Sequence, residues 1–321
     1  ASGRMLDPPE LLAAAAGKGW IDRLRQRIGA RIAEALPGDA GAIAGALTVG
    51  EQGRIRPELL EAMRVAGLAH ILTVSGFHIG IVVAGSFFLL RHLLALWPWL
   101  ALRVSVRILA ALGGGLAGTA YTLLSGAALP SVRSILAAWV VLGAMMLGRD
   151  PLAPRLIAFA AFVILMVRPE SLLSPSFQLS FAAVTALAAL AHSAPGRRLL
   201  PGAEDGVARK FGKFVLGLIL TGLVAELVLG PIALAQFGRA GLYGVVANVA
   251  AVPLTSFVLM PLLALWLLLA PLLAGFLVSW ALIPALRGLA GIGLHVAEWP
   301  GASLTLPAMS ETAMFTLLGG A

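Results

Sequence analysis

The residues of this chain that could do chemistry are few, and most lie inside apolar runs. The first such run opens with GLAHILTVSGFHIG over residues 67–80, where Ser75 and His78 are three positions apart. Residues at this spacing share one face of a helix. A hydrolase would also need an oxyanion hole, and no Gly-x-Ser-x-Gly elbow surrounds Ser75. We therefore interpret the pair as polar groups on a membrane path, or as ordinary helix packing, and expect the chain not to be an enzyme.

Glycines flank the same pair. Gly76 and Gly80 are four apart, so they lie on one helix face. Small residues at this spacing allow the backbone of a second helix to come close. We expect both glycines to lie at helix contacts.

A cation stands at the start of another apolar run, which reads Pro130, Ser131, Val132, Arg133. Proline suits the first turn of a helix. A cation there opposes the helix dipole, which favours anions at this end. Either the Arg133 side chain reaches back to lipid headgroups, or it is held at a channel mouth to meet a phosphate.

The remaining polar residues of the apolar runs are Gln178, Ser180, Gln236, Asn248 and Glu226. Polar groups are costly in a bilayer, so function is sought there first. Glu226 lies near the middle of its run and is protonated, paired or hydrated; a proton-coupled transporter would need such a carboxylate. Asn248 precedes Pro253, where a helix break would free carbonyl groups that need donors.

Several kinds of site have no counterpart in the sequence. The chain has no cysteine, its five histidines are scattered without a His-Glu-x-x-His motif, and no phosphate-binding loop ending in Gly-Lys-Ser/Thr occurs. We expect no bound metal and no other cofactor.

The composition sets the surroundings of these residues. Of 321 residues, 60% are hydrophobic and 12% are charged, and the mean hydropathy is +0.96. Soluble proteins are about 25% charged, and a soluble globule cannot hide this much apolar surface. The net charge of +8 suits anionic lipids or a polyanion. The fold class predicted is an all-α polytopic membrane protein, with about eight transmembrane or re-entrant helices preceded by short amphipathic interfacial helices.

The elements follow from periodicity and length. Amphipathic spacing predicts a helix over 20–36, followed by helices over 40–49 and from Pro57. A bilayer core of about 30 Å needs about 20 helical residues. We predict spans near 71–96, 104–124, 130–147, 153–167, 172–192, 214–236, 241–270 and 275–297. The run 241–270 is too long for one crossing and holds Pro253 and Pro261, so we expect a re-entrant half-helix and then a full one.

This pattern divides the chain into an amphipathic extracytoplasmic or interfacial segment, 1–66, and a membrane segment, 67–321, cut short at its C-terminus. We expect a fragment of a larger protein, because no Met begins it and residues 313–320 resemble the start of a span. One set of alternate loops carries nine cations: Arg91, Arg103, Arg149, Arg155, Arg197, Arg198, Arg209, Lys210 and Lys213. The opposite set carries Arg168 and Arg239. The positive side is predicted to be cytoplasmic, which puts the N-terminal segment outside.

Four stretches resemble, in order, motifs of the ComEC family of bacterial competence proteins. They are GLAHILTVSGFHIGIV at 67–82, LSGAALPSVRSILAA at 124–138, LLSPSFQLSFA at 172–182, and 225–254 with PIALAQFGR, Asn248 and AVPL. Each is weak alone, and the order and spacing make the set specific. Phe77 stands where the family often has Leu, and Glu226 where a neutral or amide residue is more usual.

The resemblance implies a channel in the bacterial inner membrane that passes single-stranded DNA into the cytoplasm during natural transformation. It also implies a DNA receptor, a cytoplasmic motor, membrane lipids, and flanking OB-like and metallo-β-lactamase-like domains that are missing from this chain. We expect the path or its gate to include Ser75, His78, Ser131, Arg133, Gln178, Ser180 and Asn248. We expect Gly76, Gly80, Pro130 and Pro253 to serve helix packing or breaks. The alternative is a secondary transporter of a small anionic solute that uses Glu226.

Overall fold

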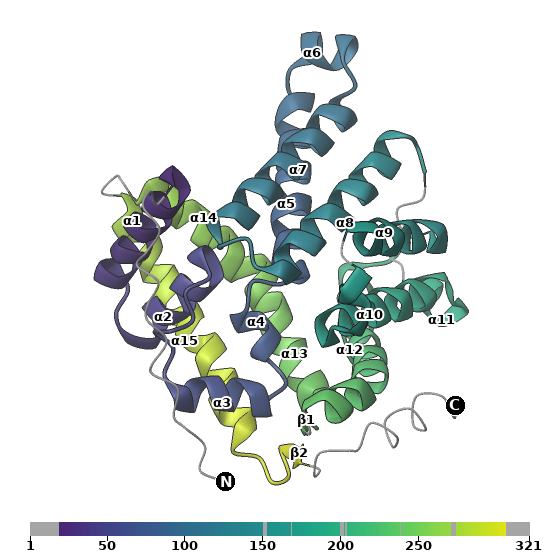
Figure 1. Cartoon of the computed structure of the whole chain (residues 1–321). Helices are drawn as coiled ribbons and strands as arrows, with labels where there is room; N and C mark the ends of the chain where they lie inside the picture. Colours follow the sequence, from purple (N-terminus) through teal and green to yellow (C-terminus); the bar gives the residue numbers. More distant parts are fainter. Residues whose placement is uncertain are drawn as a thin grey trace.

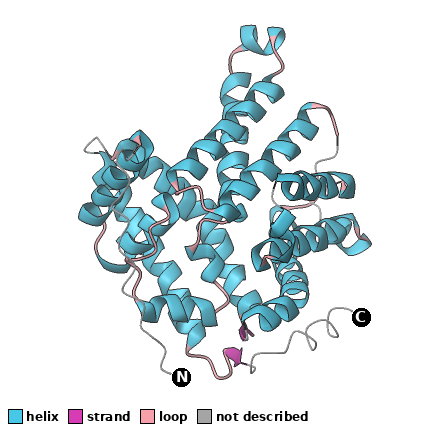
Figure 2. Ribbon diagram, in the orientation of Figure 1, coloured by secondary structure: helices cyan, strands magenta, loops and turns pink. Residues whose placement is uncertain are grey.

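In the part of the chain that the structure describes, the fold is helical apart from one short strand pair (Figure 2). The computed structural model describes residues 19–149, 153–167, 169–199, 202, 204–237, 239–270 and 274–305. Within these ranges the strands β1 (Arg239–Gly241) and β2 (Ser303–Thr305) pair antiparallel. The predicted class, an all-α polytopic membrane protein, is confirmed.

Three helices precede the membrane helices, as the sequence predicts. They are α1 (Trp20–Ala35), α2 (Gly38–Val49) and α3 (Pro57–Val65). α2 ends at Gly50, whose φ of +73° is the left-handed conformation that terminates helices at glycine. Proline occupies the first turn of α3, where its missing N–H costs no helical hydrogen bond.

Among the described residues, six helical segments are long and apolar enough to cross a membrane: α5 (Gly76–Ala95), α7 (Val106–Leu124), α8 (Leu129–Met146), α12 (Val207–Phe237), the run Gly244–Leu269 and α15 (Ala274–Ala297). The two other predicted spans are the 14-residue α9 (Pro154–Val167) and the 18-residue α10 (Pro175–His192). The short helix α4 (Ala69–Leu72) precedes α5. Three short helices connect later elements: α6 (Pro98–Arg103), the 3-10 helix η1 (Pro169–Leu173) and α11 (Ala194–Arg198).

The run predicted to be broken near Pro253 is continuous, so the expected re-entrant half-helix is wrong. α13 (Gly244–Pro253) passes into the π-helical stretch η2 (Leu254–Leu259), and this into α14 (Met260–Leu269). A π-helical stretch absorbs an irregularity without ending the helix. Pro253 therefore alters the local hydrogen bonding and does not divide the run.

The apolar side chains form two buried clusters. The larger, which we call the packed body, joins α1–α4 to α13–α15 and includes Ile43, Leu47, Leu59 and Leu282, all fully buried. In Figure 1 the purple helices of the N-terminal end accordingly lie beside the green and yellow helices α13–α15.

The smaller cluster, the hairpin bundle, joins α5, α7 and α8. Its helices come close because α7 carries glycines at the contact. A Cβ atom on Gly114 would lie 2.8 Å from the Val83 carbonyl oxygen, and one on Gly118 would lie 2.4 Å from Val83 Cγ2. In Figure 1 the pair α5 and α7 projects above the other helices, with α6 at its tip.

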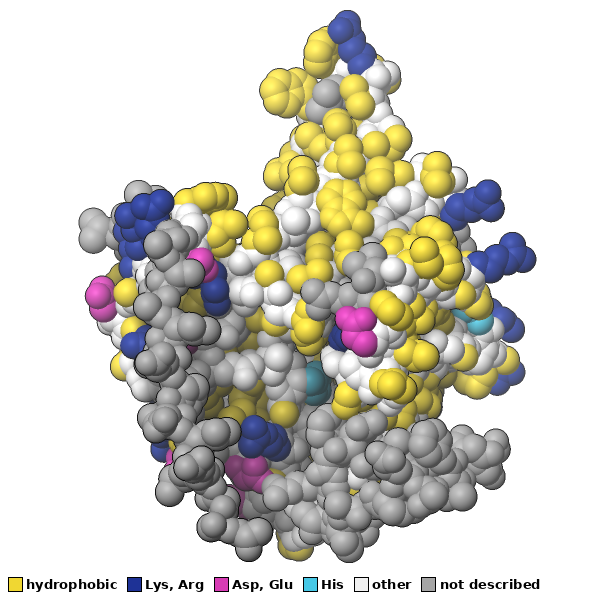
Figure 3. Space-filling view, in the orientation of Figure 1, with side chains coloured by type: hydrophobic (Ala, Val, Ile, Leu, Met, Phe, Trp, Pro, Cys, Tyr) yellow, Lys and Arg dark blue, Asp and Glu magenta, His cyan; other side chains and the backbone are white. Residues whose placement is uncertain are grey.

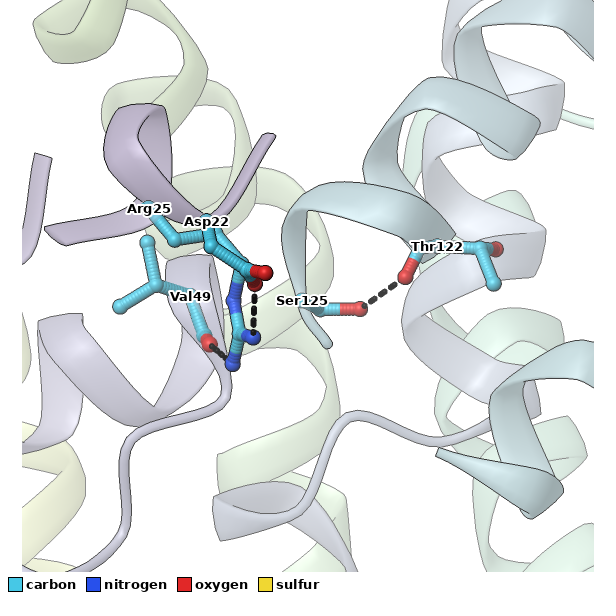
Figure 4. Close-up of polar contacts among 5 residues, drawn as sticks. All are labelled: Asp22, Arg25, Val49, Thr122 and Ser125. Carbon is cyan, nitrogen blue, oxygen red and sulfur yellow. Dashed lines mark hydrogen bonds and ion pairs between the residues drawn. The ribbon is translucent and has the colours of Figure 1, made fainter. Parts of the chain in front are cut away.

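The two clusters meet where α7 ends. Arg25 on α1 donates to the Val49 carbonyl at 3.2 Å and pairs with Asp22 at 3.4 Å, facing the end of α7, where Ser125 donates to the Thr122 carbonyl (Figure 4). Tyr121 on α7 donates its hydroxyl to the Leu47 carbonyl at 2.5 Å. The Tyr121 hydroxyl thus hydrogen-bonds the last turn of α7 to the last turn of α2.

Candidate functional site

The N-termini of α5, α8 and α10 are joined by polar contacts. Ser131, fully buried in the first turn of α8, donates to the Val74 carbonyl at 3.0 Å, just before α5 begins. A Cβ atom on Gly76 would lie 2.8 Å from Ser134 Oγ, so glycine allows α5 to start against α8. Pro130 lies in the first turn of α8, and the packing role of Gly76 stays a prediction.

Arg133 joins this pair of helices to α10. Its guanidinium donates to the hydroxyl of Ser176 and, at 3.5 Å, to that of Ser174. Ser174 is the N-cap of α10 and accepts from the Phe177 N–H at 3.3 Å. Arg133 is half-buried, and none of its contacts within the described residues is to a carboxylate.

This arrangement concentrates positive potential. Each helix N-terminus carries about half an elementary charge and N–H groups without helical partners. Three such ends and one guanidinium are linked here, while neutral hydroxyls are the partners of the cation. The combination of helix N-termini and Arg is the usual means of binding a phosphate or carboxylate. We call this the Arg133 site.

Ser75 and His78 lie at the edge of this site and contact each other. Ser75 precedes α5 as its N-cap, and its N–H donates to His78 Nδ1 at 3.4 Å, with Ser75 Oγ 3.2 Å from the same atom. Because Nδ1 accepts, neutral His78 carries its proton on Nε2. His78 is fully buried, and its Nε2 has no hydrogen-bond partner among the described residues.

Of the other predicted path residues, Gln178 joins this cluster through its backbone N–H, which donates to the Ser174 carbonyl at 3.2 Å. No side-chain contact between described residues joins Ser180 or Asn248 to the cluster. Gln178 donates to the Leu172 carbonyl at 3.3 Å, and Ser180 is exposed on α10. Asn248 lies on α13, with a buried Oδ1 that has no partner in the described part of the chain. Gly80 faces open space, so the close helix contact expected there is wrong.

Glu226 has a structural partner. Its Oε2 accepts from the Val245 N–H at 3.1 Å, in the first turn of α13. A carboxylate is favoured at a helix N-terminus because it satisfies a free N–H and complements the dipole. A Cβ atom at Gly244 would lie 3.4 Å from the same carboxylate, which is ordinary van der Waals contact, so the approach does not depend on glycine there.

Two site residues were missed from the sequence, Ser174 and Ser176. The Ser-Pro pair at 174–175 signals a helix start, and Ser176 is next to it. Nothing in the spacing connects them to Arg133, which lies 41 and 43 positions earlier. Only the folded arrangement brings these groups together.

The outer surface separates apolar from charged regions. In Figure 3 apolar side chains cover the upper projection, while Lys and Arg stand at its tip and along the right-hand edge. In the loop before α12, the Asp205 carboxylate lies 2.6 Å from Lys213 Nζ and 3.6 Å from Arg209. The hydrogen bond from Lys213 holds the pKa of Asp205 below its usual value.

Comparison with known proteins identifies the family. The Competence protein family matches residues 47–321. Competence protein ComA of Neisseria gonorrhoeae is 34% identical over 253 residues, which cover 77% of this chain and 34% of the relative. ComE operon protein 3 of Bacillus subtilis (strain 168) is 29% identical over 75% of this chain and 28% of its own length.

A further relative, Recombination protein 2 of Haemophilus influenzae, is 28% identical over 84% of this chain and 33% of its own length. The chain thus spans about a third of the length of the curated relatives it matches. No solved structure matches it. The matched residues include all the helices of the Arg133 site, and the chain belongs to the ComEC family of competence proteins.

Proposed function

We propose that this chain is the membrane part of a DNA-uptake system and passes single-stranded DNA across the bacterial inner membrane. Family membership supports a role in competence, and the observation that carries the proposal is the Arg133 site. Single-stranded DNA presents one phosphate charge per nucleotide. A path for it needs donors and positive potential inside apolar surroundings.

The hydroxyl partners of Arg133 favour brief binding of a passing DNA phosphate over tight binding of it. A buried Arg–carboxylate pair would hold the cation firmly and cancel its charge. The neutral hydroxyls of Ser174 and Ser176 leave the charge available. An arriving phosphate exchanges with them, accepts bonds from Arg133 and from helix N–H groups, and leaves when the next phosphate competes. Conduction requires such binding to be favourable but weak.

In this proposal the chain moves a polymer and catalyses no reaction. The N-terminal segment lies outside the cytoplasm, and the positive loops at Arg149, Arg155 and 197–213 face inward. A DNA receptor outside and a motor inside are the expected partners. Gln178, Ser180 and Asn248 extend the path beyond the Arg133 site.

The test replaces Arg133 in the full-length gene of a transformable source strain. We expect Arg133→Ala to lower the nuclease-protected cytoplasmic pool of labelled DNA at least about tenfold, the scale of losing one charge-assisted contact. Surface binding of DNA should be unchanged. Arg133→Lys keeps the charge but loses the forked guanidinium, so its protected DNA pool should lie between those of the parent strain and Arg133→Ala.

Arg107→Ala is the matched control. Arg107 is exposed on α7 and makes no polar contact within the described residues. Its removal should leave the protected pool as in the parent strain. Normal import in Arg133→Ala at equal membrane levels would remove the Arg133 site from the path.

A further inference from the structure

A groove of about 740 Å³ lies between α14 and α15, away from the Arg133 site, and the end of α1 closes one side of it at Ala35. The α15 wall is one helix face, because its lining residues Phe276, Trp280, Ile283 and Arg287 are spaced by four, three and four. The Phe276 and Trp280 rings are 67% and 73% exposed, so this face is open to the surroundings of the protein.

Among the described residues that line the groove, most are apolar, and Ser279 and Arg287 are the polar ones. Ser279 already has partners within the protein: it accepts from Trp266 Nε1 at 2.9 Å and donates to the Gly275 carbonyl at 3.1 Å. Arg287 is exposed and has no hydrogen-bond or ion-pair partner in the described part of the chain. An unpaired cation in a membrane-spanning helix is costly, so a partner from outside the chain is expected.

The position of Arg287 fits the headgroup layer of a bilayer. α3 crosses α15 at Gly293, where a Cβ atom would meet Met63. α3 exposes Glu58 and Arg64, so this crossing is at a wet surface. Arg287 lies six residues before Gly293, about 9 Å along the helix. From Arg287 the groove runs a further 11 residues, about 16 Å, to Phe276.

We propose that this groove binds an anionic phospholipid, with the phosphate on Arg287 and an acyl chain along the face from Ile283 to Phe276. The groove is far larger than a lone anion needs, since a water-sized group fills only about 30 Å³, so an extended ligand fits it better. An Arg at the wet end and aromatic rings beside the tail are the chemistry that such a lipid requires.

The test is native mass spectrometry of the chain purified in detergent and titrated with phosphatidylglycerol or phosphatidylcholine. We expect one tight phosphatidylglycerol per chain. Arg287→Ala should weaken it at least about tenfold, and Ala35→Trp, which narrows the groove without changing charge, should weaken it too. Phosphatidylcholine should bind at least about threefold more weakly.

Arg107→Ala is again the control, because this Arg is exposed on a membrane helix but lies outside the groove. Thermal unfolding should show that Arg107→Ala and Arg287→Ala are both folded, since neither arginine side chain has a protein partner among the described residues. Equal lipid loss in Arg107→Ala would show nonspecific charge effects and overturn the proposal. Unchanged binding in Arg287→Ala, or equal binding of both lipids, would do the same.

Discussion

The packed body and helix α12 place similar apolar sequences in opposite surroundings. In α2 every residue from Ala40 to Val49 is buried among other helices. In α12 none of the residues in its apolar window is buried, and Phe211 and Leu227 are both 67% exposed. An apolar side chain needs only to leave water, and either protein or lipid can receive it. Hydropathy therefore predicts removal from water but does not say what covers the helix.

The largest expected difference between the two regions concerns side-chain truncation. Leu47→Ala in the packed body should lower the free energy of unfolding by about 2–5 kcal/mol, because it opens a cavity in a closed core. Leu227→Ala on α12 should cost about 0.5 kcal/mol or less, because lipid fills the space. Unfolding in mixed micelles with increasing denaturing detergent measures both variants. Equal losses would mean that α12 is covered by protein.

A second pair of variants tests the joint between the packed body and the hairpin bundle. Gly50 has φ +73°, and a Cβ atom there would lie 2.2 Å from the Ser125 carbonyl oxygen. Gly38 has φ +63° with nothing within 4 Å. Gly38→Ala should cost about 1 kcal/mol for the backbone alone. Gly50→Ala should cost at least about 1 kcal/mol more, because the backbone of α7 must also shift.

The same micelle assay measures the glycine pair, and limited proteolysis of the 126–128 turn reports separation of the joint. Faster cleavage there is expected in Gly50→Ala only. Equal stability and equal cleavage rates in Gly38→Ala and Gly50→Ala would show that Gly50 does not lie close to the Ser125 carbonyl.

The smallest expected effect is electrostatic. Asp39 accepts two hydrogen bonds from Arg56, at 2.8 and 2.5 Å, and this contact lowers the pKa of Asp39. A carboxyl with a lowered folded pKa stabilises the protein above its unfolded pKa of about 3.9, and the gain is lost as pH falls through the folded pKa. The pair is exposed, so the contribution should stay below about 1 kcal/mol.

The stability difference between the parent chain and Asp39→Asn should therefore be present at pH 7 and shrink towards pH 3. Asp205 lies outside the packed body, and its hydrogen bond from Lys213 lowers its pKa. The contribution of this carboxylate to stability should therefore also be lost as the pH falls. A difference that grows on acidification would contradict the assigned role of Asp39.

Local structure was largely predictable from the sequence. Helix α1 was expected from its spacing and the start of α3 from Pro57, and both are present. Boundaries that depend on backbone detail were less accurate. The first predicted span is divided at Thr73, so α4 and α5 are separate helices, and the proline expected to break the run at 253 lies in a continuous helix.

The site was predictable in part. Ser131, Arg133, Ser75 and His78 were chosen because polar groups in apolar runs are costly, and the structure places them near one another. The partners of Arg133 were not predictable, because hydroxyl groups give no pairing signal across 41 positions. The packing of α7 on α5 was also missed, although Gly114 and Gly118, four apart on one helix face, indicate a close helix contact.

The composition of the packed body also has a consequence for synthesis. Its core unites residues up to Leu72 with residues from Ala247 onward, about 175 positions later in translation. At roughly 5–20 residues per second, the ribosome needs on the order of 10–35 s to supply the missing half. During that interval the apolar residues of α2 lack the later helices that cover them in the folded protein. The nascent chain therefore depends on the insertion machinery, or on the bilayer itself, to shield a surface that the mature protein hides.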